Sequence, residues 1–347
     1  MSRADENVRL GISLPLGSAA TAVETALFAR DRGLKEIWLA EVNGGDAYAL
    51  AGALAVGAKG MPIGTAVTPA QTRTAFVHAM AGMTLSQLTG GQFVLGIGLS
   101  SPNIVRDWAG QPFDKPLARM RDHVTTIGSL LAGEKVNYES ETLSMKKAKL
   151  GGSPDGKVPI YLGALNQKML RLCGELCDGV ILNMVPERAL GQVLGEVRAG
   201  AEAAGRDPRQ IEVVSRLHVL LTDSEDRGRQ VVRTVFGPYA ATPGYNRFFR
   251  WIGFDEEGER IAECFAAKDR DGLAKAVTKD LCDAIAVVGD ADKVRARLRA
   301  YAEQGVDVCV VNPLGDAAQA RKTIETVSGC LDGLSLPGGG VARASLA

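Results

Sequence analysis

Eight short apolar runs, most of them followed by a helical pattern, constrain the fold of this sequence more than any other feature. Runs rich in Val, Ile and Leu that alternate with helices are typical of a parallel sheet whose outer face the helices cover. Eight such units favour a closed (β/α)8 TIM barrel over an open doubly wound sheet. The runs are Arg9–Pro15, Glu36–Glu41, Met61–Val67, Phe93–Gly98, Pro159–Ala164, Gly179–Met184, Ile211–Leu221 and Val306–Asn312.

Two intervals between runs are too long for a minimal strand–helix unit, and they predict insertions after strands 4 and 7. The first contains a predicted short hairpin at Glu134–Pro154, and the second, Phe236–Asp280, is unusually aromatic. Active sites of such barrels are built from the loops that follow strands. The aromatic insertion is therefore either a wall of the substrate pocket or a segment packed on the side of the barrel or on a dimer partner. We interpret Asp283–Val288 as the approach to a helix capped by Asp290 or Asp292, although it could count as a ninth strand.

The composition excludes several classes of protein. Lys and Arg together number 40, as do Asp and Glu, so the zero net charge does not favour binding to nucleic acid or to an anionic membrane. The longest apolar stretch, Ala47–Ala58, falls short of the ~20 residues of a membrane span, and no signal peptide is apparent. We expect a cytoplasmic protein with one domain at residues 1–331 and a flexible, Gly-rich tail at residues 332–347.

The residues that could bind a metal are few. Cys173 and Cys177 share one face of a predicted helix, but without a second pair or a nearby histidine they predict buried thiols. His78 and His123 lie in helical patterns on the outer ring, where a structural role is expected. We therefore expect no metal site.

Polar side chains follow three of the predicted strands. Glu41 ends the second strand, Thr68 follows the third and Asn183 ends the sixth. The loop Ala164–Lys168 begins a helix, and the free N–H groups of a helix N-terminus attract a phosphate. One carboxylate and several backbone donors indicate a site for an organic cofactor, with little acid–base chemistry from the protein itself.

The seventh strand carries the remaining histidine. Strand alternation places His218 and Arg216 on one face, opposite Ser215 and Leu217. Which of these two faces lines the barrel is left open by the sequence.

Four segments carry a resemblance to a known family. MTLSQLTGGQFVLGIGLSS at Met83–Ser101 resembles the fourth-strand motif of the luciferase-like monooxygenase superfamily. Three further segments resemble its second strand, its third strand and its paired fifth and sixth strands: EIWLAE, IGTAVTPAQTR and VPIYLGALNQKMLRLCGELCDGVILN. The similarity extends in register from about residue 9 to 325. The sequence is most similar to the branch that uses the deazaflavin coenzyme F420.

The resemblance implies a dimeric barrel with the cofactor across its C-terminal mouth, and hydride transfer between coenzyme F420 and a small organic substrate. It further implies a cis peptide at Ala66–Val67 that backs the cofactor ring. We expect Glu41 and His218 to be catalytic. The expected cofactor contacts are Glu41, Ala66, Val67, Thr68, Gly98, Leu99, Ser100, Gly163, Ala164, Leu165, Asn166 and Asn183.

The sequence also departs from the pattern of the family. Val42 stands where several members carry a histidine, and Leu165-Asn166 where some carry a glycine pair. These differences leave the substrate and the direction of hydride flow open. Two alternatives remain: a monooxygenase of this family that uses FMN, and a non-catalytic barrel that binds flavin or acts as a scaffold.

Overall fold

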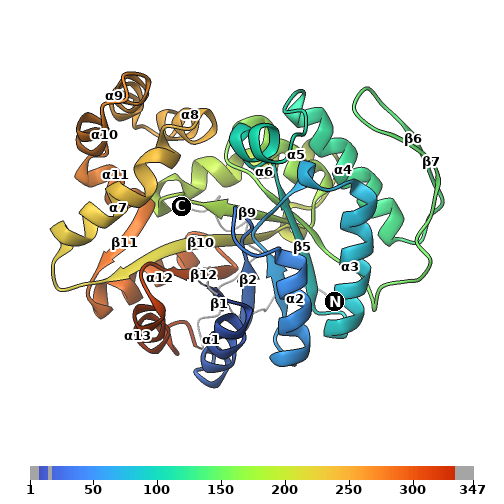
Figure 1. The fold of residues 1–347 in the computed structure, drawn as a ribbon, viewed down its shortest axis with the longest axis horizontal. Coiled ribbons are helices and arrows are strands. Elements are labelled where there is room, and N and C mark those ends of the chain that lie inside the picture. The colour runs from blue at the N-terminus through green and yellow to red at the C-terminus, as the bar shows by residue number, and fades with distance from the viewer. Residues whose placement is uncertain (1–7, 15–17, 333–347) are drawn as a thin grey trace.

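The computed structural model describes residues 8–14 and 18–332, and at its centre is a closed barrel of eight parallel strands (Figure 1). Every apolar run predicted from the sequence supplies one of these strands, so the predicted TIM barrel is confirmed. Around the barrel the order is β1 (Arg9–Ser13), β2 (Glu36–Leu39), β3 (Ile63–Thr65), β5 (Phe93–Gly98), β8 (Ile160–Gly163), β9 (Gly179–Asn183), β10 (Glu212–Leu221) and β12 (Val308–Pro313), which pairs with β1. Of the predicted tail, residues 333–347 lie outside the described residues.

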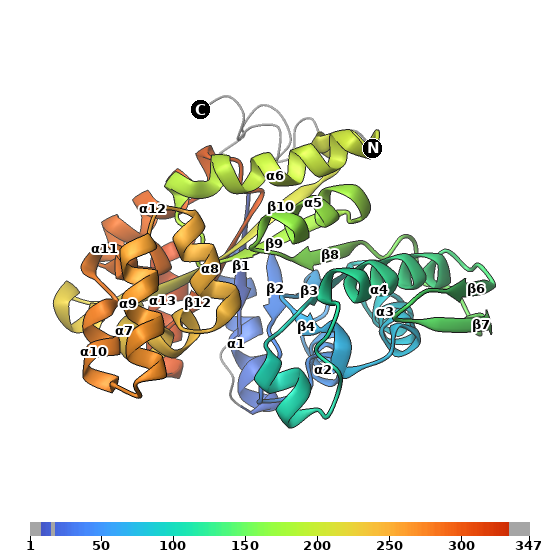
Figure 2. The same cartoon turned by 90° about the horizontal axis from the view of Figure 1, so that it is seen from above.

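Helices surround the strands and bury their apolar faces against them (Figure 2). Several begin at a side chain that accepts a backbone N–H, as Ser18, Asp46 and Thr74 do, which is the usual signal for a helix start. The helices that follow barrel strands are α1 (Ala19–Asp31), α2 (Ala47–Gly57), α3 (Ala75–Thr89), α4 (Pro116–Leu131), α5 (Gln167–Leu176), α6 (Leu190–Ala203), α7 (Glu225–Ala240) and α13 (Ala317–Val327). Short helical turns occur at Ala70–Thr72, Asn103–Trp108, Glu187–Ala189 and Pro208–Gln210.

The insertion after the fourth barrel strand contains the predicted hairpin. Strands β6 (Val136–Glu139) and β7 (Ser144–Ala148) pair antiparallel and project to one side of the barrel (Figure 1). Asp122 of α4 accepts hydrogen bonds from Tyr138 and from Ser140, at 2.8 and 2.6 Å. This buried carboxylate ties the hairpin to the barrel.

The insertion after the seventh barrel strand is helical. It continues from α7 through α8 (Pro243–Trp251), α9 (Asp255–Ala266), α10 (Arg270–Ala276) and α11 (Lys279–Ile285). These helices gather at one end of the molecule, at the left in Figure 1.

The interpretation of Asp283–Val288 as a helix approach is wrong. Ala286–Gly289 forms strand β11, which pairs with His218–Leu221 of β10. The reason is the length of β10, whose pairing with β9 ends at Arg216 and leaves its last residues free to take another strand. Asp290 then caps α12 (Ala291–Glu303) as expected, by accepting the N–H of Lys293.

The interior of the barrel is filled by side chains. Trp38, Tyr161, Ile181, Val214 and Val310 pack together inside the ring of strands. Below them, at the amino ends of the strands, Arg9 forms ion pairs with Glu36 and Glu212. Trp38 Nε1 donates to Glu36 at 2.9 Å, and the Tyr161 hydroxyl donates to Glu212. Among the described residues, these side chains therefore fill the amino end of the barrel.

Candidate active site

The inward face of β10 is the one that carries Arg216 and His218. Val214, two residues before Arg216, packs in the interior cluster, and strand alternation places Glu212, Arg216 and His218 on the same side. Arg216 lies beside Asn183 of β9, and His218 beside Asn312 of β12. The question left open by the sequence is thereby answered, and polar side chains of three adjacent strands meet at the mouth.

On the opposite side of the barrel, the third strand ends in a cis peptide at Ala66–Val67, as predicted. Strand β4 (Thr68–Pro69) follows it and pairs with β5. The Val67 side chain packs so closely against Gly98 and Gly163 that a Cβ on these glycines would lie 2.4 and 3.0 Å from its methyl carbons. Four of the predicted cofactor residues, Ala66, Val67, Gly98 and Gly163, therefore form one surface at the ends of three strands.

Glu41 lies at the rim of this surface, and its backbone N–H donates to Val67 O at 3.1 Å. Arg73 grips its carboxylate through both terminal nitrogens, at 2.7 and 2.9 Å, and the Ala47 N–H donates at 2.9 Å. Asp46 forms a second ion pair with Arg73. The sequence did not anticipate this clamp: Glu41 holds the loop between β2 and α2 and keeps few lone pairs for any other donor.

Thr68 belongs to a buried chain of hydrogen bonds. Its hydroxyl lies 3.0 Å from the Tyr48 hydroxyl, which lies 2.5 Å from His78 Nδ1, and His78 Nε2 lies 3.1 Å from Ala70 O. Burial lowers the pKa of His78 to about 3, so the ring is neutral. A neutral ring that donates through Nε2 accepts the Tyr48 hydrogen at Nδ1. The structural role expected for His78 agrees with this arrangement.

His218 is the centre of a second chain. Its Nε2 lies 3.0 Å from Asn183 Oδ1, and its Nδ1 lies 2.6 Å from Asn312 Nδ2. Burial, together with the charge of Arg216, lowers the pKa of His218 well below its ordinary value. The ring is therefore neutral and uses both nitrogens within the protein, an arrangement that suits positioning of Asn183 better than proton transfer.

The aromatic insertion, Phe236–Asp280, contacts the hydrogen-bond chain of His218 and Asn183. Asn183 Nδ2 donates to the Tyr245 hydroxyl at 2.7 Å, and the Phe236 ring packs on His218 with centroids 4.5 Å apart. Asn166 Nδ2 donates to Gly244 O at 3.2 Å. Of the alternatives held for Phe236–Asp280, these contacts favour a wall at the mouth.

The loops after β5 and β8 carry the remaining predicted residues. Ser100, after Leu99, has a left-handed backbone with φ of 62°. Asn166 precedes α5, and no side chain caps this helix because the Asn166 amide is directed to Gly244 instead. The first N–H groups of α5 thus remain available to an anion.

Two polar side chains at this end were not predicted as site residues, although the sequence left an inward position open for Arg216. Arg216 Nε is buried without a hydrogen-bond partner among the described residues, and so are both amide atoms of Gln71, just after β4. Only the even spacing of Arg216 from Glu212 could have signalled an inward position, and nothing in the sequence marks Gln71. Buried polar atoms are nearly always hydrogen-bonded, so such groups indicate where a ligand would supply the partner.

The luciferase-like monooxygenase family model matches residues 6–308. The chain belongs to this family. A 5,10-methylenetetrahydromethanopterin reductase of Methanolobus tindarius is 28% identical over 294 residues, covering 84% of this chain and 89% of the relative. A putative coenzyme F420-dependent oxidoreductase of Mycobacterium tuberculosis is 27% identical over 344 residues, covering 91% and 98%. The F420-dependent tetrahydromethanopterin reductase structure from Methanopyrus kandleri has a TM-score of 0.78 at 23% identity, covers 93% of this chain and 98% of that one, and shows the shared fold.

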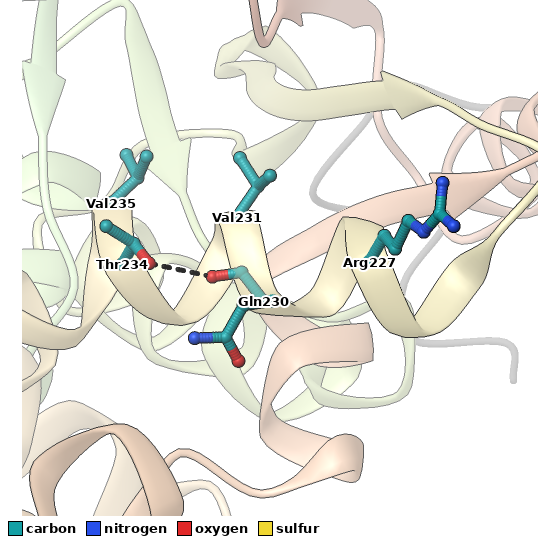
Figure 3. A pocket seen from close by; sticks show the side chains of 5 residues that line it. All are labelled: Arg227, Gln230, Val231, Thr234 and Val235. Atoms are coloured by element: carbon teal, nitrogen blue, oxygen red, sulfur yellow. Dashed lines mark hydrogen bonds between the residues drawn. The ribbon is translucent and has the colours of Figure 1, made fainter. Parts of the chain in front are cut away.

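The resemblance to luciferase-like enzymes inferred from the sequence is thus confirmed. Active sites of TIM barrels lie at the carboxyl ends of the strands, where the residues above gather. A hollow of about 320 Å³ on α7, lined by Arg227, Gln230, Val231, Thr234 and Val235, contains none of the predicted residues (Figure 3). Within the described residues, no helix is long and apolar enough to cross a membrane. The same residues contain no group of three or more His, Cys, Asp or Glu side chains arranged for a metal.

Proposed function

We propose that this protein is an oxidoreductase that uses coenzyme F420 and exchanges a hydride with a small organic substrate. The observation that carries the proposal is the surface of Ala66, Val67, Gly98 and Gly163, where three strands end and the Val67 side chain packs on the two glycines. Relatives that cover most of the chain are named as a 5,10-methylenetetrahydromethanopterin reductase and as a putative coenzyme F420-dependent oxidoreductase. When bound, coenzyme F420 supplies a hydride donor or acceptor and, with carbon at the position of flavin N5, reacts poorly with oxygen.

The residues present suit such a cofactor. Gly98 and Gly163 leave room for the Val67 side chain, and a flat ring would lie against that side chain. The buried amide of Gln71 lacks partners among the described residues, and a polar ring edge would supply them. Ser100 and Leu99 lie at the end of β5, on the same rim.

The phosphate of the cofactor would bind at the N-terminus of α5. The uncapped N–H groups there attract an anion, and Lys168 in the first turn adds a positive charge. Ala164, Leu165 and Asn166 form the loop, and Asn183 ends the neighbouring strand.

The protein's own residues orient and enclose the reactants. The clamp of Glu41 on Arg73 and Ala47 fixes the rim, and Glu41 Oε1 keeps one lone pair for the cofactor. Neutral His218 holds the Asn183 amide, and Phe236 and Tyr245 exclude water from the mouth. This division of labour, with the cofactor doing the chemistry, is usual for cofactor-dependent enzymes.

We also propose a homodimer formed through α2 and α3. These adjacent helices expose Val56 at 61%, Val77 at 38%, Met80 at 39% and Leu88 at 46%, an apolar area that a second copy would cover. Light scattering on the wild-type protein and on Met80→Glu tests it, because a charge on this face would yield monomers.

Equilibrium binding of F420 and of FMN, followed by fluorescence, tests the proposed function. We expect micromolar binding of F420 and none of FMN. Binding of FMN alone would favour a flavin monooxygenase, and binding of neither would favour a scaffold.

A further inference from the structure

Arg216 is a cation at the barrel mouth without an anionic partner. No described carboxylate lies within ion-pair distance of its guanidinium, and the one hydrogen bond that it makes to a described side chain runs from Nη2 to Ser13 Oγ at 3.4 Å. Its Nε is buried and unpaired. A buried charge without a partner is costly, so folds keep one where a ligand supplies the opposite charge.

The side chains around Arg216 are hydrogen-bond donors or neutral groups. Asn183 lies beside it in the register and donates to Tyr245, so within the described residues the Tyr245 hydrogen has no acceptor. Tyr239 and Tyr245 are close enough to interact with the Arg216 charge. His218, two residues on, is neutral because burial lowers its pKa, and two amides hydrogen-bond its ring. Within the part of the chain that the structure describes, the surroundings thus offer a positive charge and a phenolic donor and no negative charge at ion-pair distance.

The topology separates this group from the proposed cofactor surface. In the order β1, β2, β3, β5, β8, β9, β10, β12, strands β3 and β10 are four places apart in a ring of eight, so they face each other across the barrel. A ring lying against Val67 of the β3 side would present its other face to Arg216. The α5 N-terminus, proposed for the cofactor phosphate, follows β8 between them.

We propose that Arg216 and Tyr245 form an anion subsite that binds the carboxylate of a small organic acid, the substrate of the oxidoreductase. That the bound acid is the substrate rests on the proposed function. The subsite itself consists of residues of this chain. A single guanidinium matches a carboxylate in charge and in its two-pronged geometry. A phosphate dianion would retain half of its charge uncompensated. The rings of Phe236 and Tyr245 suit the apolar part of such an acid.

Isothermal titration of the full-length protein with isobutyrate and with isobutyramide, at constant ionic strength and with or without saturating F420, tests the subsite. The two probes share a shape and differ in charge. We expect wild type to bind the acid at least tenfold more tightly than the amide, and Arg216→Gln to lose this preference. Arg216→Lys, which keeps the charge, should retain part of it.

Arg227→Gln is the matched control, because Arg227 lies on α7 beside the hollow of Figure 3, among residues that take no part in the proposed sites. It should keep the full preference for the acid. Equal affinity of wild type for acid and amide would overturn the subsite, as would a preference that survives in Arg216→Gln.

A parallel fluorescence titration with F420 separates the two proposals. Acid preference without F420 binding would refute the proposed function and leave the anion subsite standing. F420 binding without acid preference would do the reverse. A tenfold loss of F420 affinity in Arg216→Gln would assign Arg216 to the cofactor and overturn the subsite.

Discussion

Within the described residues, the polar groups inside the barrel are paired at its amino end, whereas some of those at its carboxyl end lack partners. At the amino end Arg9 lies between Glu36 and Glu212, and Trp38 and Tyr161 donate to the same carboxylates. At the carboxyl end Arg216 Nε and the Gln71 amide have no partners among the described residues. One strand contributes to both ends, since Glu212 and Arg216 both lie on β10.

This difference distinguishes the charged residues that stabilise the barrel from the polar residues that are available to bind a ligand. A satisfied ionic cluster is expensive to break from one side, because the remaining charges stay buried. Unsatisfied polar groups instead reserve their hydrogen bonds for a ligand. Residues at the amino ends of TIM barrel strands serve stability, and those at the carboxyl ends serve function.

The largest expected effect comes from the amino end. Arg9→Ala leaves Glu36 and Glu212 without their shared cation, so the free energy of unfolding should fall by about 3–5 kcal/mol. Urea unfolding followed by circular dichroism measures it. Arg216→Gln, at the other end, breaks no ion pair, so it should lower the free energy of unfolding by less than about 1 kcal/mol. Equal losses in the two variants would remove the contrast between the ends.

A fall in pH should change the contributions of the two ends to the free energy of unfolding in opposite directions. The pKa of His78 is lowered to about 3 and that of His218 is lowered too, chiefly by burial. The unfolded chain therefore binds more protons below pH ~6.5, and stability is lost as pH falls. Between pH 7.5 and 5.5, His78 should lower the free energy of unfolding by about 1.4 kcal/mol, and His218 should lower it in the same direction. Burial instead raises the pKa of Glu36, which makes the folded state bind the extra proton, so stability from this group falls as pH rises.

Unfolding curves at the two pH values check the prediction, with His218→Gln as the comparison. The unfolding free energy of the variant should change less between the two pH values than that of wild type, because the contribution of His218 is absent. An equal pH dependence in wild type and His218→Gln would mean that the His218 ring binds protons as readily in the folded protein as in the unfolded chain.

A smaller effect is expected at the rim of the mouth. Glu41→Gln replaces the charged partner of Arg73 and should lower the unfolding free energy by about 1.5–3 kcal/mol. It should also weaken F420 binding, whereas Asp46→Asn, which loosens the same arginine, should not. Should both variants bind F420 alike, Glu41 would be a structural clamp alone.

The smallest effect is expected at α5. Asn166→Asp places a negative charge where a phosphate is proposed, so F420 affinity should fall by roughly tenfold, about 1.4 kcal/mol, while the fold survives. Asn166→Ala, which only removes the hydrogen bond to Gly244, is the control. Unchanged affinity in the aspartate variant would move the phosphate away from Leu165, Asn166 and Asn183.

The local pattern of the chain predicted much of this architecture. The apolar runs and their spacing predicted each barrel strand and the hairpin, because strand and helix periods are written in adjacent residues. The family resemblance predicted the cis peptide at Ala66–Val67. Strand β11 was missed, since its only partner is the far end of β10, more than sixty residues earlier in the chain.

The sequence by itself determined the barrel, the strand ends at which a site must lie and the family. Only the tertiary structure decided that Arg216 and His218 face inward, that Arg73 grips Glu41, and that Tyr245 meets Asn183. The physical reason is that alternation fixes which residues share a face but not which face is inside. Partners separated by 32 or 62 residues meet only when the barrel closes and the aromatic insertion folds over its mouth.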